Sequence, residues 1–106
     1  MATAAYIYDA VRTPRSRGKK DGTLHEVKPV ELAAGLLREL QARHDLDTSR
    51  VGDVALGCTA PVGDQGACVA KAAVQAAHWD EAVPGVQLDR FCASGLEAVN
   101  MAAAKV

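Results

Sequence analysis

One cysteine of this sequence, Cys92, lies where a thiol can act as a nucleophile. The strand-like run 86–91 ends just before it, and an alanine-rich run typical of a helix follows it. A cysteine at the start of a helix faces backbone N–H groups without an intrahelical acceptor and the positive end of the helix dipole, which favour the thiolate. The same N–H groups can form an oxyanion hole when the sulfur attacks a carbonyl. Residues 86–106 therefore predict a strand, a turn and a helix that present a nucleophile.

The other two cysteines, Cys58 and Cys68, are expected to be inert packed thiols. Cys58 ends an apolar strand-like run and Cys68 lies in a helix-like run, where a free cysteine behaves as a small hydrophobic residue. An odd number of cysteines without a CxxC pair argues against both a disulfide framework and a zinc ribbon. From spacing alone, Cys92 has a second interpretation besides that of a nucleophile: a buried core cysteine that precedes a helix.

The three histidines are scattered along the chain, at His25, His44 and His78. None of them has the spacing of a metal ligand set, so we expect no metal site. A general base must lie within hydrogen-bonding reach of its nucleophile. Nothing in the sequence indicates that one of these histidines lies beside Cys92, and we assign none of them that role.

Composition limits the classes of function. The chain has 106 residues, of which 49% are hydrophobic and 24% charged, as in one globular domain. A formal net charge of -1 predicts no general attraction to nucleic acid or to an anionic membrane. The N-terminus lacks the pattern of a signal peptide and no apolar run is long enough to span a bilayer, so a cytoplasmic location is expected.

Strand-like and helix-like runs alternate three times along the chain. The expected strands cover 5–11, 51–58 and 86–91; the expected helices cover 29–43, 67–77 and the residues after Cys92. This alternation predicts a layered α/β/α fold in which the three strands lie in one mainly parallel sheet. We expect Asp64 to cap the second helix, and we expect the third helix, which is nearly all apolar or small, to be covered on most sides.

A basic loop, 15–22, follows the first expected strand. It has two interpretations: contact with the phosphates of a nucleotide-bearing substrate, or solvated surface. We favour solvated surface, because most charge runs are solvated and no aromatic residues alternate with these charges.

Three segments together resemble the N-terminal portion of a thiolase. They are Tyr6-Ile7-Tyr8-Asp9-Ala10-Val11-Arg12-Thr13-Pro14, then Val54-Ala55-Leu56-Gly57-Cys58 with Gly63 and Gln65-Gly66, and Asp89-Arg90-Phe91-Cys92-Ala93-Ser94-Gly95-Leu96-Glu97-Ala98-Val99. The last one carries the most weight, because a cysteine followed by small residues, glycine and an apolar helix is similar to the thiolase nucleophile signature. The resemblance implies that 1–106 is part of a thiolase N-terminal domain, with the C-terminal domain outside this chain.

The resemblance also implies an activity. A thiolase is an acyltransferase whose cysteine attacks a 3-ketoacyl-CoA, releases acetyl-CoA and passes the acyl group to coenzyme A, and Cys92 matches that cysteine. The motif looks closer to degradative thiolases of fatty acid metabolism than to biosynthetic ones. The implied partners are acyl-CoA and coenzyme A, both as substrates, and a second copy of the chain in a homo-dimer or tetramer. No further cofactor is implied.

The resemblance covers only part of the family's catalytic set. The catalytic histidine and the second cysteine of thiolases belong to C-terminal motifs that have no match here, so we expect the isolated chain to be inactive. Two alternatives remain open: a β-ketoacyl synthase-like condensing enzyme, against which Arg12-Thr13-Pro14 argues, and a non-catalytic fragment that serves as an assembly or dimerisation module.

Overall fold

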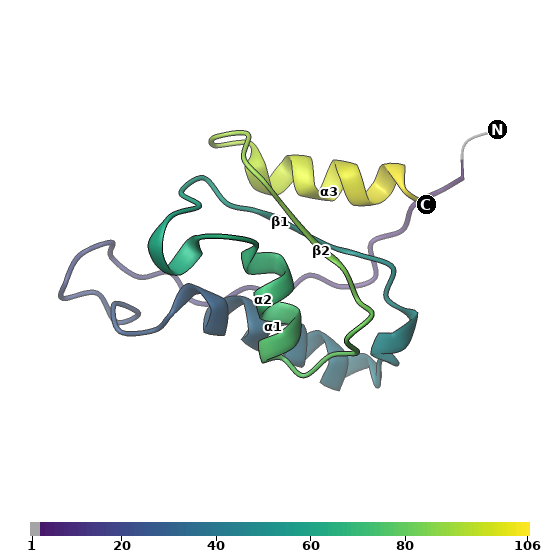
Figure 1. Cartoon of the computed structure of the whole chain (residues 1–106), viewed down its shortest axis with the longest axis horizontal. Helices are drawn as coiled ribbons and strands as arrows, with labels where there is room; N and C mark the ends of the chain where they lie inside the picture. The colour runs from purple at the N-terminus through teal and green to yellow at the C-terminus, as the bar shows by residue number, and fades with distance from the viewer. Residues whose placement is uncertain (1–2) are drawn as a thin grey trace.

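A computed structural model describes residues 3–106 as a two-stranded parallel sheet between helical layers (Figure 1). The elements in chain order are α1 (Pro29–His44), the 3-10 turn η1 (Thr48–Arg50), β1 (Val54–Gly57), the 3-10 turn η2 (Gly63–Gln65), α2 (Val69–Ala76), β2 (Gly85–Leu88) and α3 (Ser94–Ala104). α1 and α2 pack against each other on one side of the strands, and α3 covers the other side. The predicted α/β/α class with a parallel sheet is confirmed.

The two strands pair in parallel along their whole length. Val54 lies opposite Gly85 and Gly57 lies opposite Leu88. Beyond the last pair, the Cys58 N–H donates to the Leu88 carbonyl oxygen at 2.9 Å. The carboxyl ends of β1 and β2 therefore lie side by side, and the segments that follow them leave the sheet at the same edge.

The start of α2 differs from the prediction. Ala67, where the helix was expected to begin, has a left-handed φ of 53°, so no helix can start there. The first N–H of the helix, that of Val69, donates to the side-chain oxygen of Gln87 on β2 at 2.8 Å. The expected cap, Asp64, lies in η2 instead. That prediction is wrong because a neighbouring strand supplies the acceptor.

The core lies between α1, α2 and the connection that leads to β2. Its buried members are Ala34, Val74, Ala77, Trp79 and Val83. α2 also crosses β2 closely, since a Cβ atom on Gly85 would lie 2.5 Å from the backbone nitrogen of Lys71. Glycine is therefore required at the start of β2 for the helix to reach the sheet.

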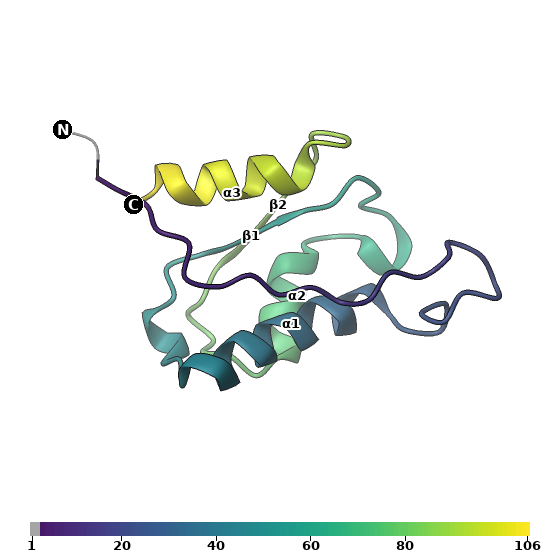
Figure 2. The ribbon, with the colours of Figure 1, turned by 180° about the vertical axis from the view of Figure 1, so that it is seen from behind.

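The segment expected to form the first strand does not join the sheet. Residues 3–17 form neither a helix nor a strand, and Tyr6 and Tyr8 are 74% and 89% exposed. The segment crosses the molecule beside α1 (Figure 2), and a cavity of about 230 Å³ lies between Val11, Leu40 on α1 and Leu56 on β1. The prediction of a third strand is wrong for this chain. Strand propensity depends on pairing with a neighbour, and here the segment contacts the last turn of α1 instead.

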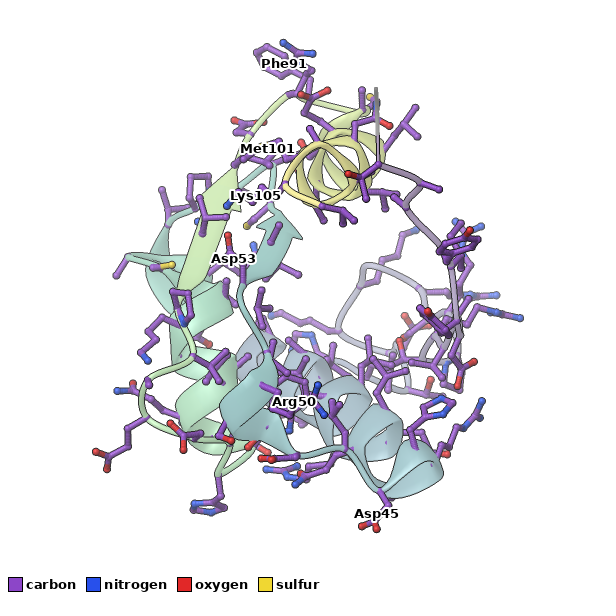
Figure 3. The ribbon with its side chains drawn as sticks, turned by 90° about the vertical axis from the view of Figure 1, so that its right-hand side faces the viewer. Asp45, Arg50, Asp53, Phe91, Met101 and Lys105 are labelled. Carbon is purple, nitrogen blue, oxygen red and sulfur yellow. The ribbon has the colours of Figure 1, made fainter. Side chains whose placement is uncertain are left out.

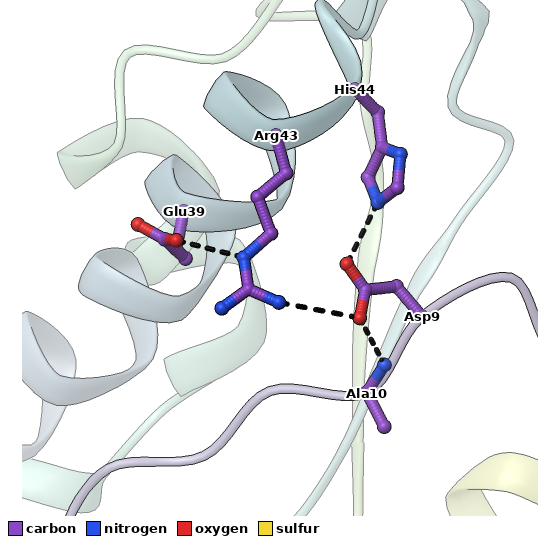
Figure 4. A network of polar contacts seen from close by, with 5 residues as sticks. All are labelled: Asp9, Ala10, Glu39, Arg43 and His44. Atoms are coloured by element: carbon purple, nitrogen blue, oxygen red, sulfur yellow. Dashed lines mark hydrogen bonds and ion pairs between the residues drawn. The ribbon is translucent and has the colours of Figure 1, made fainter.

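A cluster of charged side chains makes that contact (Figure 4). One carboxylate oxygen of Asp9 lies 2.8 Å from His44 Nε2, and the other lies 3.5 Å from Arg43 Nη1 and accepts the Ala10 N–H at 2.7 Å. Arg43 is oriented by a further bond of 2.8 Å from its Nε to Glu39. The hydrogen bond with His44 is the main reason why the pKa of Asp9 lies below its ordinary value.

Removing this carboxylate should release the N-terminal segment. We expect Asp9→Ala to make the chain more sensitive to trypsin at Arg12 and Arg15, because the His44 and Arg43 contacts disappear. Asp64→Ala, at an exposed aspartate of η2, is the matched control and should leave the cleavage rate unchanged. Equal cleavage of both variants and the wild type would show that Asp9 does not hold the segment.

The same contact predicts a pH dependence. Folding lowers the pKa of Asp9, so the ionised carboxylate contributes to the stability of the folded chain. This contribution is complete above the ordinary pKa of 3.8 and is lost as the pH falls through the lower pKa of the folded state. An NMR titration of the Ala10 amide, which donates to this carboxylate, should have its midpoint below 3.8.

The third helix is covered on one side only. In α3, Ser94 and Ala98 are buried, whereas Leu96 and Val99 are 67% and 55% exposed. The prediction of a helix covered on most sides is therefore wrong for this chain, because β1 is the element that α3 packs against. The far end of α3 is held by an ion pair between Lys105 and Asp53, just before β1 (Figure 3). Within residues 3–106, none of the helices has the length and hydrophobicity needed to cross a bilayer.

Candidate active site

The structure has Cys92 in the turn between β2 and α3, where its side chain is exposed. The helix begins two residues later, at Ser94, with Ala93 in the N-cap position. This exposure does not fit the alternative of a buried core cysteine. A solvent-accessible thiol beside a helix start is the arrangement found for reactive cysteines.

The residue before the cysteine, Phe91, has a left-handed backbone conformation. Its φ is 50°, the residue is 80% exposed, and its side chain points away from the body of the molecule (Figure 3). A left-handed conformation costs a non-glycine residue on the order of 1–2 kcal/mol. Since the exposed ring gains little from packing, the backbone around Phe91 must be held by other contacts.

Hydrogen bonds with Asp89 and Ser94 hold both peptide groups of Phe91. The Phe91 N–H donates to Asp89 Oδ1 at 2.8 Å. The Phe91 carbonyl oxygen accepts from Ser94 Oγ at 2.6 Å and from the Ser94 N–H at 3.1 Å. Ser94 Oγ in turn accepts the Arg90 N–H at 2.8 Å. We call this set of contacts, made by Asp89 and Ser94, the Phe91 clamp.

The start of α3 offers free backbone donors. The Glu97 N–H makes the first regular helical bond, to the Ala93 carbonyl oxygen at 2.9 Å. Gly95 and Leu96 are the second and third residues of α3. Their N–H groups have no intrahelical acceptor, because no turn of helix precedes them. Such groups, with the helix dipole, can bind an anion or stabilise an oxyanion.

Close packing against β1 positions this helix start. A Cβ atom on Gly57 would lie 2.4 Å from the carbonyl carbon of Ser94 and 2.7 Å from the Gly95 nitrogen. Only glycine allows the backbone of α3 to come so near to the strand. An ion pair of 3.0 Å between Arg90 and Glu97 adds a bond between the turn and the helix.

The other two cysteines and the three histidines make no hydrogen bond with this turn within the described residues. Cys58 and Cys68 are half-buried, and Cys68 Sγ lies 3.4 Å from the Gly85 carbonyl oxygen. His44 contacts Asp9, and His25 lies 3.7 Å from Glu26. His78 is in the connection that leads from α2 to the start of β2. Within residues 3–106, the structure has no hydrogen bond between a histidine and Cys92.

Three residues that shape the site received no role from the sequence: Asp89, Ser94 and Gly57. A signal for two of them was present, since aspartate often accepts the N–H two residues ahead and serine is common in the first turn of a helix. The role of Gly57 depends on a helix that lies almost forty positions later in the chain, and no local pattern indicates it.

Comparison with known proteins agrees with this geometry. Residues 5–106 match the family described as "Thiolase, N-terminal domain". The chain belongs to the thiolase family. The match includes the strand pair, the turn with Cys92 and α3, so the site described above lies within the thiolase N-terminal domain.

Individual thiolases are similar over almost the whole chain. A steroid 3-ketoacyl-CoA thiolase of Mycobacterium tuberculosis is 41% identical over 97% of this chain and 25% of its own length. A beta-ketoadipyl-CoA thiolase of Pseudomonas aeruginosa is 41% identical over 96% of this chain and 25% of its own. The crystal structure of an acetyl-CoA acetyltransferase of Bacillus anthracis, 34% identical, superposes on 80% of this chain and 21% of that chain, with a TM-score of 0.73. The chain thus spans about a quarter of the length of these relatives.

Proposed function

We propose that this chain carries the nucleophile of a thiolase, and that Cys92 accepts the acyl group as a thioester. The observation that supports this most directly is the exposed Cys92 thiol at the start of α3, within the region that matches the thiolase family. The general reaction class, acyl transfer to and from coenzyme A, agrees with the names of the similar proteins.

The proposed reaction has two half-reactions. The Cys92 thiolate attacks the keto carbon of a 3-ketoacyl-CoA, and the carbon–carbon bond to the neighbouring methylene breaks. Acetyl-CoA leaves after its carbanion takes a proton, and the acyl group stays on sulfur as a thioester. Coenzyme A then gives its thiol proton to the base, and its sulfur attacks this thioester. The bond between the acyl carbon and Cys92 Sγ breaks, so the shortened acyl-CoA leaves and the Cys92 thiolate is restored. The N–H groups of Gly95 and Leu96 are candidates to stabilise the oxyanion in each step.

The base and the acid of this cycle are not assigned to residues of the chain. A positioned base contributes about 10²–10⁴-fold to such reactions, and His25, His44 and His78 contact other groups or lie away from the turn. We therefore propose complete turnover only for a protein that contains this chain together with those groups. A homo-dimer or tetramer is the assembly implied by the family resemblance.

The experiment that tests the proposal is mass mapping of thiol reactivity. In the intact protein near neutral pH, we expect iodoacetamide to label Cys92 faster than Cys58 or Cys68, because Cys92 is exposed and the other two are half-buried. An acyl-CoA should protect Cys92 from labelling by acylating it. Preferential labelling of Cys58 or Cys68, or no protection by acyl-CoA, would contradict the assignment.

A further inference from the structure

We propose that Ser94 and Asp89 are positioning residues of the nucleophile. They hold Phe91 in a left-handed backbone conformation, and this conformation sets the position of Cys92, the next residue. This inference rests on the proposed function, in which Cys92 is the acyl acceptor. It assigns to the Phe91 clamp a role in the reaction beyond the stability of the turn.

The clamp holds the turn in a conformation that Phe91 does not favour by itself. Phe91 has a φ of 50° and an exposed ring, so neither its backbone preference nor its packing favours this conformation. Its N–H is bound by Asp89, and its carbonyl oxygen is bound by both donors of Ser94. A strained residue persists only when its surroundings determine its conformation. In this turn, those surroundings are the side chain of Asp89 and the hydroxyl and N–H groups of Ser94.

Ser94 acts on the backbone of the turn. Ser94 is 4% exposed, and its hydroxyl accepts the Arg90 N–H and donates its single hydrogen to the Phe91 carbonyl oxygen. The backbone of Ser94 is also fixed by the close contact with Gly57 on β1. This hydroxyl therefore acts through the backbone on either side of Cys92, with no donor left for a substrate. It ties the turn to the rigid junction of β1 and α3.

The conformation of Phe91 determines where the Cys92 sulfur lies. Cys92 directly follows Phe91, so a change at Phe91 towards a right-handed or extended conformation moves the sulfur relative to the N–H groups of α3. A displacement of about 1 Å can reduce a reaction rate about 10²-fold. The Ser94 hydroxyl is buried and donates to Phe91, and Asp89 accepts the Phe91 N–H. Loss of either contact should therefore lower the rate of acyl transfer without weakening the binding of acyl-CoA.

The test compares two matched pairs of variants in the intact protein. Ser94→Ala removes the hydroxyl and Ser94→Thr keeps it; Asp89→Ala removes the acceptor and Asp89→Asn keeps it. Ser49→Ala is the control, since that hydroxyl bonds Asp47 in an exposed turn elsewhere, at 2.6 Å. The formation of the acyl adduct on Cys92 is followed by mass spectrometry at increasing acetoacetyl-CoA, which separates the maximal rate from the half-saturating concentration.

We expect Ser94→Ala and Asp89→Ala to lower the maximal rate about 10- to 100-fold with little change in the half-saturating concentration. Ser94→Thr and Asp89→Asn should recover most of the rate, and Ser49→Ala should match the wild type. If Ser94→Ala does not fold, the Asp89 pair decides the matter, because Asp89 is exposed. Wild-type rates in folded Ser94→Ala and Asp89→Ala would overturn the inference. A failure of the proposed function gives a different result from a failure of the positioning role. In that case the wild type itself would form no adduct on Cys92, and the positioning role would be refuted together with the proposed function.

Discussion

Cys92→Ser is expected to abolish the acyl adduct that the intact protein forms with a 3-ketoacyl-CoA. A serine hydroxyl is a poor nucleophile unless a strong base lies beside it. Within residues 3–106, no histidine is bonded to residue 92, and the N–H groups of Gly95 and Leu96 cannot remove a proton. The adduct should therefore fall below detection in the mass spectrum of the intact protein, after incubation under conditions in which the wild type is acylated.

The matched controls are Cys58→Ser and Cys68→Ser. Both thiols are half-buried, and neither lies in the turn before α3. Each of these variants should still form one adduct at the wild-type rate, provided that its melting temperature is unchanged. An adduct that persists in Cys92→Ser, or that disappears in Cys58→Ser or Cys68→Ser while the fold is intact, would show that the acyl group is carried elsewhere.

Gly57→Ala is expected to destabilise the fold strongly for a change of a single methyl group. The added Cβ would lie 2.4 Å from the Ser94 carbonyl carbon and 2.6 Å from the Ser94 oxygen. These are backbone atoms, so the clash cannot be relieved by the rotation of a side chain, and α3 must move away from β1. Overpacking of this kind costs about 1–3 kcal/mol. Denaturant unfolding should show a loss at the upper end of that range, and the same shift of α3 should slow the alkylation of Cys92.

Gly35→Ala is the control for replacing a glycine by alanine without a steric clash. Gly35 lies at an exposed position inside α1, and a Cβ atom there would meet nothing within 4 Å. Alanine is favoured over glycine within a helix by roughly 0.5–1 kcal/mol, so this variant should be more stable than the wild type. If Gly57→Ala unfolds at the same denaturant concentration as the wild type, α3 does not pack as closely on β1 as described.

The exposed turn with Cys92 illustrates what local sequence can indicate. The apolar run before the cysteine and the alanine-rich run after it are sufficient to predict β2, a turn and α3. In the same way, the four-residue spacing of Leu32, Leu36 and Leu40 predicts α1, which the structure has at Pro29–His44. These predictions succeed because helices and strands have short periods, so a window of about ten residues contains the signal.

The N-terminal segment shows the limit of the same method. Residues 5–11 have the composition of a strand, yet Asp9 bonds to His44, 35 positions later, and the segment stays outside the sheet. A strand exists only where another strand accepts its hydrogen bonds, and composition does not specify that neighbour. The N-cap of α2 is similar: its acceptor is Gln87, 18 positions away, whereas the local candidate Asp64 is not used.

For the candidate site, the sequence by itself determined which cysteine is the proposed nucleophile, the order of strand, turn and helix around it, and the resemblance to thiolases. Only the tertiary structure decided how the turn is held: the left-handed Phe91, its bonds to Asp89 and Ser94, and the contact of Ser94 with Gly57. The physical reason is that residue type and short-range spacing specify local conformation and chemistry. Geometry to within an ångström, in contrast, depends on packing between β1 and α3, which are separated along the chain and meet only when the sheet has formed.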